Sequence, residues 1–285
     1  MILRHPVPTV ALQRAITDLA CAPSLMPERL DPSLRRSLAH RLCVSGPART
    51  AGSARLDSWT ILSGLREHPA SRETFSWSPR TARRILGTAA ASLVIRGAEP
   101  NPTSAVRHEI ARHIELSQGR ARRPSSLSIW LSEAPRGVLG AVMAEAVSYA
   151  TDLVSLFDWN RVGTSGHVGI PDPVWVVPGA PWISLRGRRD AVVDLDPVHR
   201  TRALISVRAG RPRPSSPHDL AIVALIDALA APDAPLATRV VGIWPSAGRA
   251  LSLEVSPEII DDAARLVLRA VTRPAAVEPM ASAAG

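Results

Sequence analysis

Apolar residues recur at helical spacing through the first 157 residues of the chain. The pattern predicts helices over 9–20, 32–42, 79–97, 103–116 and 132–157. Serine followed by proline at positions 78 and 79 is typical of a helix start, because serine caps the first turn and proline is tolerated at its first position. A loop rich in Arg and Ser is expected over 118–126. We therefore expect the N-terminal half to be α-helical.

Beyond residue 159 the pattern changes to short β-branched or alternating runs bounded by Pro and Gly. It predicts strands over 174–177, 182–195, 202–207, 239–244 and 250–255, the last two joined as a hairpin. It also predicts helices over 216–231 and 257–271. The order is helix, three strands, helix, two strands, helix. The expected fold class is therefore α+β, with an α-helical N-terminal half followed by a mixed β-sheet flanked by helices.

Three regions are expected along the chain. Residues 1–77 form an N-terminal helical region, 78–273 form a unit with the helices of 78–157 and the sheet core of 174–272, and 274–285 form an Ala-rich, disordered tail. The composition, 46% hydrophobic over 285 residues, is enough for a buried core. Gln13 and Arg14 interrupt the N-terminal apolar run, and Asp227 interrupts the run 220–231. We expect a cytoplasmic protein with no membrane partner.

Positive charge is concentrated in the first half of the chain. Residues 1–150 hold 20 Arg and 11 acidic residues, whereas 151–285 hold 14 of each. The sequence contains no lysine, so all 34 basic residues are Arg, which excludes mechanisms that need a lysine ammonium, such as a Schiff base or a P-loop lysine. Two interpretations of the Arg excess stay open: a polyanionic partner, or codon bias with solvated Arg on helix surfaces.

Several catalytic signatures are excluded by spacing. Cys21 and Cys43 lie too far apart for a CxxC pair, and we expect buried thiols. His108 and His113 are five positions apart, about 140° around a helix, so they cannot share a metal as an i,i+4 pair does. The segment 163–167 lacks the GxSxG spacing of a serine hydrolase and is expected to be a flexible loop.

Two predicted strands and the helix after them carry a recognisable motif. The first strand contains Gly187, Arg188 and Asp190, the second contains Ser206, Arg208 and Gly210, and Asp219 begins the helix. This pattern resembles the RecB-like branch of the PD-(D/E)XK nuclease superfamily, whose core has the order α-β-β-β-α-β. The resemblance implies that Asp190 is the metal-binding aspartate of a G-R-x-D motif. It also implies that Ser206 and Arg208 stand where the second acid and the lysine belong, and that Asp219 stands at the start of the Gln-Leu helix. The upstream glycine-helix motif would correspond to 86–90, without its histidine.

The departures from that motif predict a catalytically degenerate protein. An active enzyme of this class holds Mg²⁺ or Mn²⁺ with several carboxylates, but Asp190 is a poor metal site alone. Ser206 brings a neutral hydroxyl, and Arg208 cannot lose a proton as a lysine does. Asp194 and Asp196 share strand parity with Asp190, but Asp194 lies about 13 Å along the strand. We therefore expect no cofactor, with Mg²⁺ or Mn²⁺ required if catalysis survives.

Three functions follow from these residues. The first is a degenerate nuclease fold that binds DNA through arginines; the candidates are Arg80, Arg83, Arg84, Arg120, Arg122, Arg123, Arg186, Arg188, Arg208, Arg211 and Arg213. The second is a protein-interaction module, and the two differ in whether these arginines converge around strand 182–195. The third is an active nuclease whose site is rebuilt from Asp190 with Asp194 or Asp219.

Simpler structural roles are open for the same residues. Asp190 beside Arg188 and Arg189 is also typical of a surface ion pair. His218 and Asp219 have positions suited to capping their helix, since Ser216 and Asp219 have the spacing of a capping box. Tryptophans on the predicted strands are expected to fill gaps in the core; they are Trp175, Trp182 and Trp244.

Overall fold

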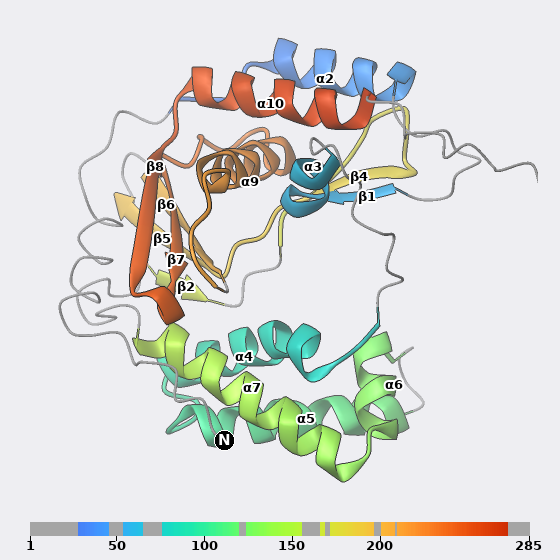
Figure 1. The fold of residues 1–285 in the computed structure, drawn as a ribbon, viewed down its shortest axis with the longest axis vertical. Helices are drawn as coiled ribbons and strands as arrows, with labels where there is room; N and C mark the ends of the chain where they lie inside the picture. Colours follow the sequence, from blue (N-terminus) through green and yellow to red (C-terminus); the bar gives the residue numbers. More distant parts are fainter. Residues whose placement is uncertain are drawn as a thin grey trace, which may run out of the picture.

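The computed structural model describes residues 28–45, 54–64, 76–119, 124–155, 166–168, 172–196, 201–208 and 210–272. These residues form three layers, with a mixed β-sheet between two groups of helices (Figure 1). One helical layer contains α4 (Pro79–Ile95), α5 (Pro102–Gln118), α6 (Ser126–Glu133) and α7 (Arg136–Ser155). The other contains α2 (Pro32–Ser45), α3 (Ser58–Gly64), α9 (Ser216–Ala230) and α10 (Pro257–Thr272). The expected α+β class is confirmed.

The central sheet has five strands in the order β2-β5-β6-β7-β8. Their bounds are β2 (Gly166–Val168), β5 (Ala191–Asp196), β6 (Thr201–Val207), β7 (Arg239–Trp244) and β8 (Arg249–Glu254). Strands β6 and β7 are parallel, and the other neighbours are antiparallel. A parallel pair needs a crossover connection, which α9 supplies on one face of the sheet. A 3-10 turn (Pro245–Ala247) closes the hairpin between β7 and β8.

A second, three-stranded sheet joins the N-terminal region to the rest of the structure. Its order is β1-β4-β3, with β1 (Ala54–Asp57) parallel to β4 (Ile183–Arg186) and β3 (Val174–Val176) antiparallel to it. Leu38 and Leu42 of α2 and Ile61 of α3 belong to the same buried core as α9 and α10. The described part of region 1–77 is thus packed into the sheet-containing half of the molecule.

The alternation of side chains along the strands accounts for the two cores. Ala203 and Ile205 of β6 face the layer of α4 to α7, whereas Leu204, between them, faces α9 and α10. Both faces of a sheet covered by helices require apolar residues at successive positions. Strands β5, β6 and β7 meet this requirement with continuous β-branched and apolar runs.

Local signals predicted most of the elements correctly. Helices α2, α4, α5, α9 and α10 and strands β3, β6, β7 and β8 lie within a few residues of the expected ranges. Ser78 caps α4 as expected, and its side chain accepts a hydrogen bond from the Thr81 backbone N–H at 3.2 Å. The helix expected over 9–20, the loop residues 120–123 and the tail 274–285 lie outside the described residues.

Three expected elements were wrong. The run 182–195 is two strands, β4 and β5, in different sheets, separated at Gly187–Asp190. The stretch 132–157 is divided at Ala134 and Pro135, where α6 ends and α7 begins. Residues 166–168, expected in a flexible loop, form strand β2 along β5.

Helix α7 is long and apolar enough, by length and composition, to cross a membrane, and 28% of its apolar window is buried inside the described part of the chain. A helix of this kind occurs in membranes and in protein interiors alike. Here it lies along α4 (Figure 1), with Val142, Ala146 and Leu153 fully buried between the helices and the sheet.

Candidate functional site

Asp190 lies at the break between β4 and β5 and is 1% exposed. Its backbone N–H donates to the Ile205 carbonyl at 2.8 Å, which fixes it beside β6. Its Oδ1 accepts hydrogen bonds from Arg84 Nε at 2.8 Å and from the Tyr149 hydroxyl at 3.0 Å. Its Oδ2 accepts the Val207 backbone N–H at 2.7 Å. Asp190 is therefore a buried acceptor with both oxygens occupied, not the surface ion pair that its neighbours suggested.

Arg84 reaches this carboxylate from the second turn of α4. Its guanidinium also forms a bidentate pair with Asp172, with N–O distances of 2.8 and 2.6 Å, and donates to the Arg189 carbonyl at 3.2 Å. Bidentate arginine-carboxylate pairs are the strong, geometrically specific kind. Arg84 thus connects the helical layer to both segments that flank the small sheet.

Tyr149 is placed by a close crossing of α4 and α7. A Cβ on Gly87 would lie 2.9 Å from the Tyr149 Cβ and 2.9 Å from the Ala146 carbonyl, so only glycine permits this approach. The hydroxyl of Tyr149 donates to Asp190 and accepts from Arg188 Nη2 at 3.1 Å. We call Arg84, Tyr149, Asp172, Arg188 and Asp190 the arginine-carboxylate network.

Arg188 is the second cation of the network. Its Nη2 donates to the Val207 carbonyl at 2.8 Å, and its Nε lies 3.7 Å from Asp190 Oδ2, while 32% of its side chain stays exposed. Ser206 is fully buried, and its hydroxyl donates to the Arg188 carbonyl at 3.4 Å. The residue at the expected second-acid position therefore supports the Arg188 backbone.

The charged groups of the network shift one another's pKa values. Burial alone would raise the pKa of Asp190, but Arg188 and Arg84 outweigh it and hold the pKa below its ordinary value. Burial likewise opposes the charge of Arg84, yet the hydrogen bond to Asp172 and the charge of Asp190 raise its pKa. Burial, reinforced by Asp190, raises the pKa of Tyr149 to about 12. The carboxylate is ionised and the hydroxyl protonated across the physiological range.

Arg208 forms a separate ion pair with Asp219, with an N–O distance of 2.9 Å. The Arg208 side chain is only 14% exposed, and burial lowers the pKa of its guanidinium although Asp219 opposes the shift. The expected capping role of Asp219 was wrong: Ser215 is the N-cap without a side-chain bond, and the Ser216 hydroxyl accepts the Arg213 backbone N–H at 2.8 Å.

Asp227 anchors a further ion-pair cluster that the sequence analysis did not predict. It is 1% exposed in the middle of α9, and its two oxygens accept from Arg189 Nη1 and from Arg202 Nη2, the latter at 2.7 Å. The signal available in the sequence was its position: a single acid inside the apolar run 220–231 needs a buried partner. Asp172 and Tyr149 carried no local signal of this kind.

The arginines expected to contact DNA divide into three groups. Arg84, Arg188 and Arg208 are bound to carboxylates as described, and Arg83 pairs with Glu145 at 3.2 Å. Arg120, Arg122 and Arg123 lie outside the described residues. The exposed members are Arg80, at the start of α4, and three that we call the rim arginines: Arg186, Arg211 and Arg213.

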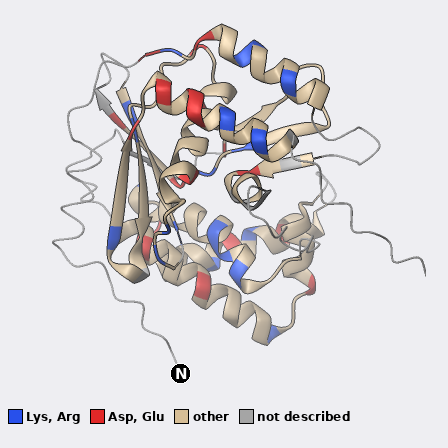
Figure 2. Ribbon diagram, turned by 45° about the horizontal axis from the view of Figure 1, so that its top comes forward, with Lys and Arg blue, Asp and Glu red and all other residues tan. Residues whose placement is uncertain are grey.

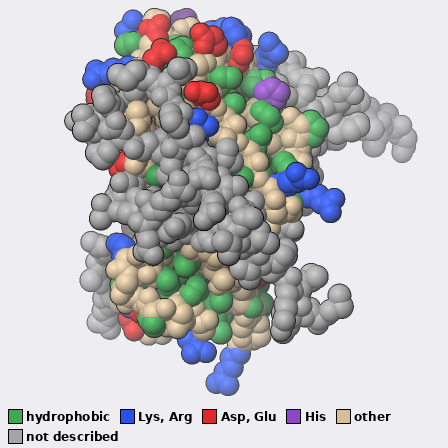
Figure 3. Space-filling model, turned by 90° about the vertical axis from the view of Figure 1, so that its left-hand side faces the viewer, with side chains coloured by type: hydrophobic (Ala, Val, Ile, Leu, Met, Phe, Trp, Pro, Cys, Tyr) green, Lys and Arg blue, Asp and Glu red, His purple; other side chains and the backbone are tan. Residues whose placement is uncertain are grey.

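The rim arginines come from two segments, one that carries Arg188 and one that follows Val207, whose backbone contacts Arg188 and Asp190. Arg186 ends β4 two residues before Arg188, and Arg211 and Arg213 follow β6 in the connection to α9. Basic and acidic residues otherwise occur in both halves of the molecule (Figure 2). On the face shown in Figure 3, basic side chains lie at the upper end, at the right-hand edge at mid-height and at the lower end, with acidic side chains among the upper ones.

The donor set around Asp190 does not fit Mg²⁺ or Mn²⁺. Both oxygens already accept N–H or O–H donors, and two guanidinium groups lie within 4 Å, where they would repel a cation. Asp219 pairs with Arg208, and Asp194 is four residues further along β5. Within the described ranges no three His, Cys, Asp or Glu side chains form a group that would hold a metal.

The histidines of α5 have different partners: His108 Nδ1 lies 3.0 Å from Glu99, and His113 Nδ1 lies 2.9 Å from the Ser128 hydroxyl. Of the three tryptophans expected to fill the core, Trp175 and Trp244 do so, with 2% and 3% of their surface exposed, and Trp182 is partly buried against the same core as Trp175.

No family model, curated protein or solved structure matches the chain. Its function must therefore be inferred from the geometry. The network binds the layer of α4 to α7 to the segments that carry the strands through charge-assisted hydrogen bonds.

Proposed function

We propose that this chain is a catalytically inactive protein with a PD-(D/E)XK-like, RecB-like core that binds DNA through its rim arginines. One observation carries the proposal: the Asp190 carboxylate, at the position of the metal-binding aspartate, is saturated by Arg84, Tyr149 and the Val207 N–H. The Asp190 side chain is 0% exposed, so its oxygens do not face solvent, from which a metal ion would bind.

The order of elements in the central sheet supports the resemblance. Helix α7, strands β2, β5 and β6, helix α9 and strand β7 follow one another as α-β-β-β-α-β. Among the described elements of this stretch, only β3 and β4 intervene, and they belong to the other sheet. Strand β2 thus takes the place that the sequence analysis gave to 174–177, and Asp190 precedes the second strand of this order.

The rim arginines support the DNA-binding part of the proposal. Arg186, Arg211 and Arg213 are exposed, and they are close in sequence to Arg188 and Val207, which contact Asp190. Contacts from arginine to phosphate give affinity that falls steeply with salt and has little sequence preference. We therefore expect binding of duplex DNA without cleavage.

The test is a titration of labelled duplex and single-stranded DNA at rising KCl with Mn²⁺ present, with retention and fragment length measured in the same samples. We expect retention of intact DNA that falls between about 50 and 200 mM KCl. The triple variant Arg186→Gln, Arg211→Gln, Arg213→Gln should lower the slope of log affinity against log salt by about 2.7, at about 0.9 for each phosphate contact.

The matched control replaces three other exposed arginines by glutamine: Arg107, Arg136 and Arg249. An equal loss in the control would show that net charge, not the rim, determines retention. DNA fragments that form only with Mn²⁺ would support an active nuclease with a rebuilt site instead. In that case Asp190→Ala should abolish the cleavage.

One observation favours the protein-interaction alternative. Four of the arginines expected to contact DNA bind carboxylates of this chain instead: Arg83, Arg84, Arg188 and Arg208. Arginines neutralised in this way give structural stability and little field for a polyanion. Absence of DNA retention at the lowest salt would leave this alternative in place of DNA binding.

A further inference from the structure

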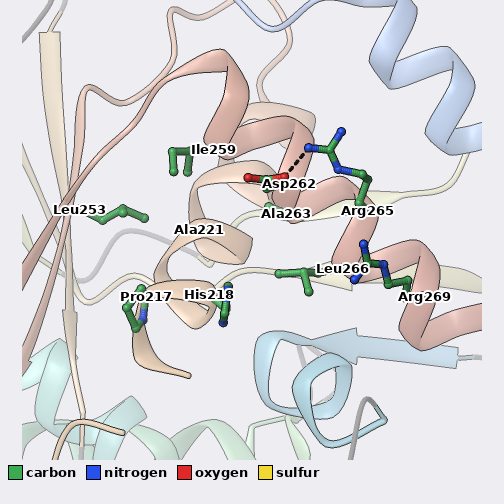
Figure 4. Close-up of a pocket in the computed structure, with 10 residues that line it drawn as sticks. All are labelled: Pro217, His218, Ala221, Leu253, Ile259, Asp262, Ala263, Arg265, Leu266 and Arg269. Atoms are coloured by element: carbon green, nitrogen blue, oxygen red, sulfur yellow. Dashed lines mark hydrogen bonds and ion pairs between the residues drawn. The ribbon is translucent and has the colours of Figure 1, made fainter. Parts of the chain in front are cut away.

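A cleft of about 360 Å³ lies on the far side of α9 from the arginine-carboxylate network, between the start of α9, strand β8 and helix α10 (Figure 4). The side chains deepest in it are apolar: Ala221, Leu253, Ile259, Ala263 and Leu266. Its volume lies within the range of small-ligand sites, which are mostly apolar with a few convergent polar groups.

The floor of the cleft is created by small residues where α9 and α10 pack together. Ala221 is 6% exposed and Ala263 is fully buried, while Leu266, Ile259 and Leu253 are half-buried around them. Methyl side chains at the crossing leave space that the larger neighbours line but do not fill. An aliphatic group placed there would lose water contact on several sides, which is favourable in proportion to the area covered.

The polar residues of the cleft include one arginine that no described carboxylate neutralises. Asp262 pairs with Arg265 one turn away along α10. Arg269, one further turn along, and His218, in the first turn of α9, are exposed and have no carboxylate partner among the residues that the structure describes. In Figure 4 Leu266 lies between these two side chains, so the basic groups border the apolar floor.

We propose that this cleft binds a small amphiphilic carboxylate, with its aliphatic body on the floor and its carboxylate at Arg269 and His218. Arginine matches a planar carboxylate with two parallel N–H donors. A neutral ligand would make only apolar contacts with the floor, and a cationic ligand would be repelled by the Arg269 guanidinium.

The test compares three probes with the same ten-carbon chain and different head groups: decanoate, decan-1-ol and decyltrimethylammonium. Binding to the full chain is measured by isothermal titration calorimetry below the micellar concentration of each probe. We expect decanoate to bind most tightly, decan-1-ol more weakly, and the ammonium probe weakest. Arg269→Gln should weaken decanoate about three- to fivefold, the range of an exposed ion pair, and leave decan-1-ol unchanged.

The matched control is Arg107→Gln, which removes the same charge from an exposed position on α5 in the other helical layer. Circular dichroism of both variants checks that the fold is intact, as expected for exposed residues. Failure of decanoate to bind overturns the proposal. So does equal binding of the three probes, or an equal loss in the two variants, because either would mean that Arg269 makes no specific contact.

Discussion

Replacing Asp190 by asparagine is the most direct test of the arginine-carboxylate network. The substitution keeps the shape of the side chain but removes the charge that Arg84 and Arg188 face, and it turns one acceptor into a donor opposite existing donors. Removal of one partner from a buried ion pair costs about 3–5 kcal/mol. In the variant, Arg84 keeps its bidentate pair with Asp172 and is 24% exposed, and Arg188 is 32% exposed. Both guanidinium charges therefore remain partly paired or solvated. We therefore expect the lower end, about 3 kcal/mol of unfolding free energy.

The assay is urea unfolding at pH 7, followed by the fluorescence of the seven tryptophans and extrapolated linearly to zero denaturant. The control is Asp262→Asn, which removes a carboxylate from the exposed pair with Arg265, whose side chains are 61% and 60% exposed. This control should change the unfolding free energy by no more than about 0.5 kcal/mol. An Asp190→Asn loss below about 1 kcal/mol would refute the claim that the network holds the layers together.

The stability difference between the wild-type protein and Asp190→Asn should depend on pH. Because the pKa of Asp190 is lower in the folded state than in the unfolded chain, its contribution is present above the ordinary Asp pKa, near about 3.9. This stabilising contribution is lost as the pH falls through the lower pKa that Asp190 has in the folded state. The stability gap between wild type and Asp190→Asn should therefore be constant from pH 7 to 5 and narrow in more acidic solution. A gap that stays constant into acid contradicts the assignment of a depressed pKa.

Two further predictions use the same region. Tyr149 is the sole tyrosine, so the ultraviolet absorbance of the whole protein should report an ionisation near pKa 12 in the folded chain and near the ordinary value of about 10 in urea; equal midpoints would contradict its burial against Asp190. Gly87→Ala should destabilise by about 1–3 kcal/mol in urea unfolding, because its Cβ meets Tyr149 and the Ala146 carbonyl. Gly140→Ala on α7, where a Cβ meets nothing within 4 Å, should instead stabilise by up to about 1 kcal/mol, and the opposite order would refute the close crossing.

Elements with a local cause were predictable from the sequence. Ser78 caps α4 because its own hydroxyl accepts the Thr81 N–H, a bond that depends on residues three positions apart. The helical patterns of α9 and α10 likewise depend on neighbours along the chain. The location of the candidate site was predictable too, since Asp190, Ser206 and Arg208 lie close together at one end of the sheet.

The features that were predicted wrongly depend on contacts between residues far apart in the sequence. The run 182–195 has the composition of one strand, but Gly187 fits closely against Pro173, where a Cβ would lie 2.8 Å from its Cγ, and the chain changes sheets there. An aspartate beside two arginines is usually exposed. Asp190 is buried because Arg84, 106 positions earlier, and Tyr149, 41 positions earlier, reach it through a helix crossing that no local pattern encodes.

Under the proposed function, the network takes the place of the metal of a nuclease site while the fold is kept. A divalent cation and two guanidinium groups bring the same charge to Asp190, so the buried carboxylate is neutralised in either case. A metal ion has open coordination positions for water and substrate, whereas Arg84 and Arg188 are parts of the chain, offer no such positions and stay protonated. Stability and binding then depend on different residues. Substitutions in the network should lower stability at every salt concentration, and substitutions of the rim arginines should change DNA binding alone.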